Sequence, residues 1–129
     1  MGSKNSLSSY LLPFNQMKYG FVKVAAASPF VRVADCAYNI SRIEALTREA
    51  DAKGVEIITF PELSITGYTC GDFFLKPFLN DQAEEALLEL AKRTADTSVL
   101  IIVGMPIRIK SQLFNAAVAL QSGQILGAI

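Results

Sequence analysis

The sequence predicts an α/β fold in which two main helices pack on a mixed β-sheet. Three features lead to this prediction: apolar residues recur with a helical period between positions 36 and 50, a uniformly apolar run occupies 99–103, and turn residues separate short apolar runs near the C-terminal end. The 129 residues are 51% hydrophobic. This composition supplies enough apolar surface for the core of one domain of ordinary size.

The first half of the domain has the order of a βαβ unit. Residues 19–27 and 55–60 are rich in strand formers, and the helix between them is predicted to begin after Asp35 and to end at Gly54. Strands joined by such a crossover helix are normally parallel. A second helix is predicted to begin after Asp81, which would be its N-cap, with Glu84 as the return partner of a capping box.

The second half is predicted to be antiparallel. Strands are expected at 99–103, 107–109, 113–120 and 124–129, with turns at 110–112 and 121–123. Gly104-Met105-Pro106 is expected to end or bend the first of these strands. The last residue, Ile129, falls within an apolar strand, so we expect the chain to be a fragment of a longer domain. Residues 1–16 are predicted to be a disordered leader or tag-like segment, which leaves 17–129 as the domain.

The composition excludes several functional classes. The 12 basic and 12 acidic residues balance, which does not favour a nucleic-acid surface. No apolar run approaches the ~18 residues of a membrane-spanning helix. The chain has no histidine, so Ser-His-Asp and Cys-His mechanisms and imidazole metal sites are impossible within it. Two cysteines without a secretory signal indicate a cytoplasmic protein.

Glu62 is the candidate catalytic residue. It follows a predicted buried strand and Pro61, which has no N–H to donate to a sheet. A rigid strand end fixes the position of a carboxylate, as a general base requires. The alternative is a carboxylate that caps nearby backbone amides. Cys70 is a weaker candidate for a nucleophile, because no lysine or helix start lies next to it to activate its thiol.

Several motifs resemble those of one superfamily. Pro61-Glu62-Leu63 followed by Thr66-Gly67-Tyr68 is similar to the first signature of the nitrilase, or carbon–nitrogen hydrolase, superfamily. Residues 66–74 (TGYTCGDFF) are similar, more particularly, to the amino-terminal glutaminase domain of bacterial glutamine-dependent NAD synthetases. Further matching segments follow in the family's order: Asp35 with Asn39, Gly54, 103–106, 115–117 and 123–127. The resemblance covers residues 19–129.

The resemblance implies a fold and an activity. The fold is a nitrilase-like four-layer α-β-β-α sandwich, of which this chain would hold the first sheet, its helices and part of the second sheet. The activity is glutamine hydrolysis, with the ammonia passed to a synthetase domain that uses ATP and Mg²⁺ to amidate nicotinic acid adenine dinucleotide. The resemblance implies no cofactor or metal within this chain. It also implies a homo-oligomer.

The resemblance also assigns roles to residues. The family uses a glutamate, a lysine and a cysteine, of which only the glutamate is present, as Glu62. The lysine and the cysteine are expected beyond Ile129, so the chain alone is expected to be inactive. Tyr68 matches the tyrosine that helps to form the family's glutamine pocket. A tyrosine after a glycine turn can also be a lid that packs on the core.

Two other functions remain open at this stage. The chain could come from another amidase or nitrilase of the same superfamily, which would keep the motif around Glu62. An ATP-binding synthetase domain in the complete gene product would separate these two possibilities. The third possibility is a complete, non-catalytic α/β domain that only binds partners, for which clean monomeric behaviour with cooperative unfolding would be evidence.

Overall fold

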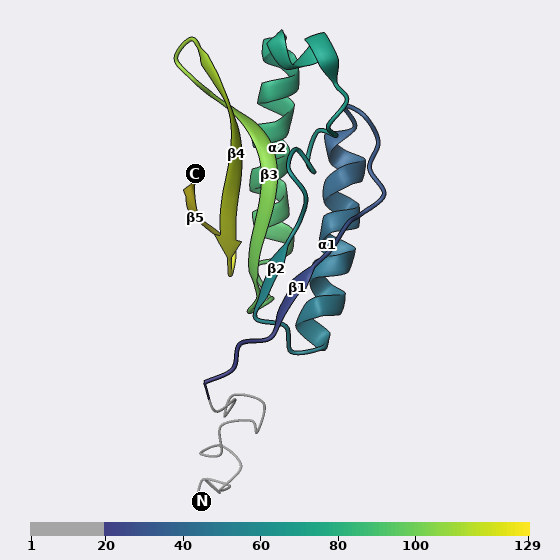
Figure 1. Cartoon of the computed structure of the whole chain (residues 1–129), viewed down its shortest axis with the longest axis vertical. Helices are drawn as coiled ribbons and strands as arrows, with labels where there is room; N and C mark the ends of the chain where they lie inside the picture. Colours follow the sequence, from purple (N-terminus) through teal and green to yellow (C-terminus); the bar gives the residue numbers. More distant parts are fainter. Residues whose placement is uncertain (1–19) are drawn as a thin grey trace, which may run out of the picture.

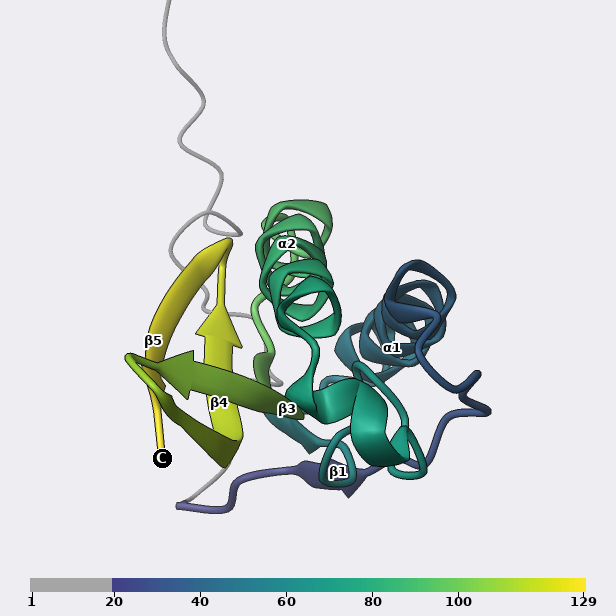
Figure 2. The same ribbon diagram turned by 90° about the horizontal axis from the view of Figure 1, so that it is seen from above.

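The computed structural model describes residues 20–129, so the leader predicted at 1–16 lies outside the described residues. A single five-stranded sheet has the order β1-β2-β3-β4-β5, and two helices lie side by side over one of its faces (Figure 1, Figure 2). This arrangement confirms the predicted mixed α/β class. The bounds are β1 Val24–Ala26, α1 Cys36–Ala52, β2 Ile57–Thr59, the 3₁₀ helix η3 Gly71–Leu75, α2 Pro77–Arg93, β3 Leu100–Ile109, β4 Gln112–Gln121 and β5 Gln124–Ala128.

The βαβ unit is confirmed. β1 pairs with β2 in parallel, and β2 pairs with β3 in parallel. Asp35 is the N-cap of α1, because its Oδ1 accepts a hydrogen bond from the backbone N–H of Tyr38 at 3.0 Å. Gly54 follows the helix with a φ of +70°, a conformation that glycine adopts without a steric penalty. The two strands are three residues each, shorter than the apolar runs that predicted them.

The antiparallel half is also confirmed. Of the two outcomes expected at Gly104-Met105-Pro106, a strand end or a bend, the strand end is wrong. β3 runs unbroken for ten residues and pairs with β4 over nine positions, while β4 pairs with β5. Backbone groups alternate in direction along a strand, so the nitrogen of Pro106 faces the same side as that of Gly104, toward β2. β2 has already ended at Thr59, which pairs with Ile102. The missing N–H of Pro106 therefore costs no ladder hydrogen bond.

A second difference concerns the number of sheets. The resemblance implied part of a second sheet, whereas all the strands of residues 20–129 belong to one sheet. The run at 113–129 extends the sheet that β1, β2 and β3 begin, because β4 pairs directly with β3. The prediction that this chain holds part of a second sheet is therefore wrong for the described residues.

The second helix begins earlier than predicted. α2 starts at Pro77, and Asp81 lies inside the helix, so the predicted cap at Asp81 is wrong. Proline suits the first helical position because its φ is already helical and its missing N–H would have no partner there. Asn80 supports this start, since its Nδ2 donates to the carbonyl oxygens of Phe74 and Lys76 at 3.1 Å each.

The core fills the space between the helices and one face of the sheet. Its fully buried side chains include Ile43 of α1, Leu90 of α2 and Ile58, Ile101 and Val103 of the sheet. No described element covers the opposite face, which we call the open face. In the described part of the chain, neither helix combines the length and apolar character that a membrane span requires.

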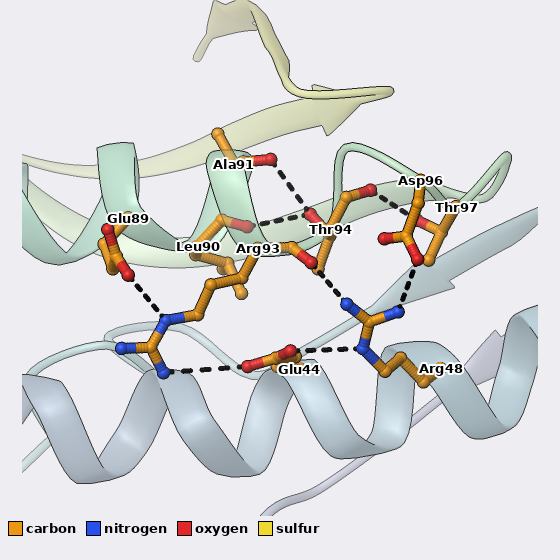
Figure 3. A network of polar contacts seen from close by, with 9 residues as sticks. All are labelled: Glu44, Arg48, Glu89, Leu90, Ala91, Arg93, Thr94, Asp96 and Thr97. Carbon is orange, nitrogen blue, oxygen red and sulfur yellow. Dashed lines mark hydrogen bonds and ion pairs between the residues drawn. The ribbon is translucent and has the colours of Figure 1, made fainter.

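An ion-pair network joins the outer sides of α1 and α2 (Figure 3). Glu44 lies between two arginines, 3.1 Å from Arg48 Nε and 3.7 Å from Arg93 Nη1. Arg48 also contacts Asp96 at 3.0 Å, and Arg93 contacts Glu89 at 2.8 Å. The hydrogen bond from Arg48 holds the pKa of Asp96 below its ordinary value of 3.8. Since all of these side chains except the partly buried Glu44 are exposed, the network stabilises the helix pair only slightly.

We expect the ion-pair network to stabilise the fold slightly at neutral pH and not in acid. A carboxylate whose pKa is lower in the folded chain stabilises the fold at neutral pH, and this contribution is lost as the pH falls below about 4 through the lowered pKa. Arg48→Met is therefore expected to lower the melting temperature slightly at pH ~7 and by much less at pH ~2. Calorimetry at both pH values measures this. An equal decrease at both would mean that Arg48 acts through contacts that acid does not remove, such as the hydrogen bond from its Nη2 to the carbonyl of Arg93.

Candidate active site

The chain crosses closely over β3 just after β2 ends. The backbone N–H of Phe60 donates to the carbonyl of Ile102 at 2.9 Å, and the chain then passes over Gly104. A Cβ atom on Gly104 would lie 2.4 Å from the nitrogen of Leu63 and 2.5 Å from the Cα of Glu62. Only glycine leaves room for this crossing.

Polar contacts hold the crossing in place. The N–H of Gly104 donates to Ser64 Oγ at 3.3 Å, and the N–H of Ile65 donates to the carbonyl of Gly104 at 3.2 Å. Leu63 has a φ of +53°, in the left-handed region that residues with side chains rarely adopt. Such strain persists only where the surrounding structure enforces it. The backbone that carries Glu62 therefore has a fixed path across the sheet.

The side chain of Glu62 lies on the open face. It is exposed, and its Oε2 accepts a hydrogen bond from Asn115 Nδ2 at 2.8 Å. Glu62 and Asn115 line a hollow of about 290 Å³, which we call the Glu62 hollow. The other residues that line it are Thr59, Phe60, Ile102, Val103, Gly104, Ala116, Ala117 and Ile129. The hollow thus joins one acidic and one amide side chain to small and apolar neighbours.

The structure does not bring Tyr68 to the same hollow. Tyr68 is 65% exposed and is absent from the described residues that line the Glu62 hollow. It is also absent from a second, more apolar hollow of about 210 Å³ lined by Leu63, Phe74, Pro106, Leu113, Phe114 and Asn115. The substrate-binding role of Tyr68 stays a prediction.

Both cysteines are buried. Cys36 is 5% exposed and belongs to the core, and its burial raises the pKa of its thiol to about 11. Cys70 is 3% exposed, and its thiol donates to the carbonyl of Thr66 at 3.1 Å. A buried thiol whose hydrogen is bonded to a backbone carbonyl does not suit a nucleophile.

Asn39 anchors the segment that follows Glu62. It is completely buried, and its Nδ2 donates to the carbonyls of Arg32 and Ile65 at 2.8 Å each. Its Oδ1 accepts from the N–H of Arg32 at 2.7 Å. In the sequence, Asn39 stands out only as a position that matches the family motif. Its place among apolar residues on the inner side of α1 was the signal that it serves a buried network.

Replacing Asn39 with alanine is expected to destabilise the fold by about 2–4 kcal/mol, because three backbone groups, one buried and two partly buried, lose their hydrogen-bond partner. Denaturant unfolding of the chain measures the effect. Ser41→Ala in the same helix is the control, since it removes one local bond from Ser41 Oγ to the carbonyl of Tyr38. A similar, small loss of stability in both variants would contradict the anchoring role of Asn39.

Two contributors to the site came from outside the predicted motif. Gly104 and Asn115 lie in segments that match the family, but neither of them was predicted to act near Glu62. Asn115 interrupts an otherwise apolar strand, which was a usable signal for a functional polar group. Gly104 carried no such signal, because only the crossing of Glu62 and Leu63 shows why a side chain is excluded there.

Known proteins share both the sequence pattern and the fold. A family model described as carbon-nitrogen hydrolase matches residues 22–129. The glutamine-dependent NAD(+) synthetase of Mycobacterium tuberculosis is 33% identical over 116 residues, which cover 90% of this chain and 17% of that protein. The corresponding Drosophila melanogaster enzyme is 35% identical over 88 residues, which cover 68% of this chain and 11% of that protein.

Solved structures agree. The glutamine-dependent NAD(+) synthetase of Cytophaga hutchinsonii superposes with a TM-score of 0.77 at 30% identity, covering 83% of this chain and 18% of that chain. The amidase of Nesterenkonia sp. AN1, at 19% identity, shares the fold with a TM-score of 0.70 over 92% of this chain and 44% of that chain. This chain therefore spans less than a fifth of the length of the synthetases that it matches.

The sheet, its two helices and the carboxylate at the end of β2 define a protein with the nitrilase fold. The chain belongs to the carbon–nitrogen hydrolase family. Its sequence relatives are glutamine-dependent NAD synthetases.

Proposed function

We propose that this chain is the N-terminal part of the glutaminase domain of a glutamine-dependent NAD synthetase. The single observation that carries the proposal is the position of Glu62, whose backbone is fixed over Gly104 and whose carboxylate enters a hollow on the open face. The names of the sequence relatives support glutamine as the amide and NAD synthesis as the use of the ammonia. In this proposal the parent protein is a homo-oligomer.

Glu62 acts as the general base in the proposed reaction. It takes the proton of a cysteine thiol as the sulfur attacks the side-chain amide carbon of glutamine, and it returns that proton to the departing ammonia. It then takes a proton from water as the water attacks the thioester, and it returns that proton to the departing cysteine sulfur as glutamate is released. The cysteine, and the lysine that stabilises the tetrahedral oxyanion, come from outside residues 1–129. In this proposal Tyr68, in the loop before η3, remains a contact of glutamine, although its side chain lies outside the described lining of the Glu62 hollow.

ATP and Mg²⁺ have no assigned residues in this chain. In the proposal they act in a synthetase domain elsewhere in the parent protein, where the ammonia amidates nicotinic acid adenine dinucleotide. The coverage supports this separation of the two reactions. The chain matches only 17% and 18% of the length of two synthetases, so most of such a protein is available for a separate synthetase domain.

The test compares two proteins, the complete gene product and the isolated 129-residue chain. We expect the complete product to release ammonia and glutamate from glutamine, and the isolated chain to release none. A complete product that leaves glutamine intact would contradict the proposal. Hydrolysis of another amide but not glutamine would retain the family and overturn the synthetase assignment.

A further inference from the structure

We propose that Asn115 is a positioning residue for the carboxylate of Glu62, a role that rests on the proposed function of Glu62 as a base. The Nδ2 of Asn115 donates to Oε2 of Glu62 at 2.8 Å. This bond occupies one carboxylate oxygen and leaves Oε1 to receive the proton. Asn115 thus determines which oxygen acts as the base and where that oxygen points.

The paired strands β3 and β4 hold both Asn115 and Gly104, the glycine over which the backbone of Glu62 crosses. Asn115 lies opposite Pro106 in the β3–β4 ladder, and two positions along the same ladder Ala117 lies opposite Gly104. The backbone of Glu62 is therefore located by β3 and its side chain by β4, in one antiparallel pair of nine registered positions. A slip of a single residue would turn the Asn115 side chain to the other face of the sheet.

The chemistry of the amide suits this role. Among the described residues that line the Glu62 hollow, only Thr59 and Asn115 carry side-chain hydrogen-bond donors. An amide donor holds one oxygen of a carboxylate through a hydrogen bond without placing a positive charge beside it. The bond joins exposed side chains, so it adds little to stability. Its loss should change the rate of proton transfer rather than the fold.

The test measures glutamine hydrolysis by the complete gene product with Asn115→Leu. We expect kcat to fall roughly 10- to 100-fold while KM changes by less than about 3-fold, because the base is misdirected and substrate binding is retained. Gln112→Leu is the matched control, since it replaces another exposed amide three residues earlier on β4. It should leave both constants within about 2-fold.

A double-mutant cycle separates this inference from the proposed function. In a Glu62→Gln background, Asn115→Leu should cause no further loss, because the side chain that Asn115 still holds can no longer act as a base. An undiminished kcat in Asn115→Leu, or a full additional loss in the Glu62→Gln background, would overturn the positioning role alone. Full activity of Glu62→Gln would instead overturn the proposed function.

A second measurement needs no activity. In the 129-residue chain, ¹³C relaxation of the Glu62 side-chain methylene groups should show restricted motion, and Asn115→Leu should make these groups more mobile. Gln112→Leu should leave their motion as it is. Equal mobility in the original chain and in Asn115→Leu would contradict the positioning role whatever the catalytic result.

Discussion

Replacing Glu62 with glutamine in the complete gene product is expected to lower kcat for glutamine hydrolysis by roughly 10²- to 10⁴-fold. Glutamine has almost the same size as glutamate, and its carbonyl oxygen can still accept the hydrogen bond from Asn115. It cannot take a proton at neutral pH, so the thiol and the water lose their acceptor. Because Glu62 is exposed, the fold should be unaffected.

The measurement is the initial rate of ammonia release at saturating glutamine, with circular dichroism to verify the fold. Glu84→Gln makes the same chemical change at an exposed carboxylate on α2 and should keep the original rate. An unchanged rate in a folded Glu62→Gln variant would remove Glu62 from the mechanism. An equal loss in both variants would indicate a general charge effect instead.

Replacing Gly104 with alanine is expected to destabilise the fold by roughly 3 kcal/mol or more and, where the protein still folds, to lower kcat by about 10²-fold. The added methyl group would lie 2.4–2.7 Å from the backbone of Glu62 and Leu63. Real carbon atoms do not approach so closely, so either the crossing segment or β3 must shift. The bonds of Gly104 with Ser64 and Ile65 would be disturbed by the same shift.

Gly127→Ala is the matched control for this prediction. Gly127 also lies in a strand, but no atom would lie within 4 Å of its added Cβ. Denaturant unfolding of the 129-residue chain should show a large loss of stability for Gly104→Ala and little change for Gly127→Ala. Equal stability of the two variants would mean that the crossing over Gly104 adapts easily and does not fix Glu62.

The sequence predicted the parts of the fold that depend on local pattern. The helical period after Asp35 and the glycine at 54 were enough to place α1 and the parallel strands on either side of it. The alternation of apolar runs and turns was enough to identify the antiparallel half. These signals lie within a few residues of the structure that they specify, so they can be recognised without knowledge of the neighbours.

The errors arose where a distant neighbour decides the outcome. Pro106 stays within β3 because β2 has ended before it could need the missing N–H, and nothing near Pro106 in the sequence reveals this. The start of α2 at Pro77 was missed because Asp81 and Glu84 fit a capping box equally well in sequence. The bonds that Asn80 makes to the preceding segment favour the earlier start.

The candidate site also contains one residue that local sequence identifies and others that only distant contacts reveal. Glu62 was predicted from its place after a buried strand and from the resemblance of the motif around it. Its partner Asn115 lies 53 residues away and meets it only because β3 pairs with β2 and β4 pairs with β3. Gly104 likewise acquires its role only when the chain crosses it. A strand-end carboxylate can thus be found in the sequence, whereas the residues that hold it require the structure.

The most direct test of the central claim, that Glu62 is the proton acceptor, is formate rescue of Glu62→Ala in the complete gene product. Alanine removes the carboxylate and leaves space on the open face in which a small acid can bind. The account predicts a large loss of glutamine hydrolysis that added sodium formate partly restores in a saturable manner, with no effect of formate on the original protein. Glutamine hydrolysis at the original rate by Glu62→Ala without formate would contradict it.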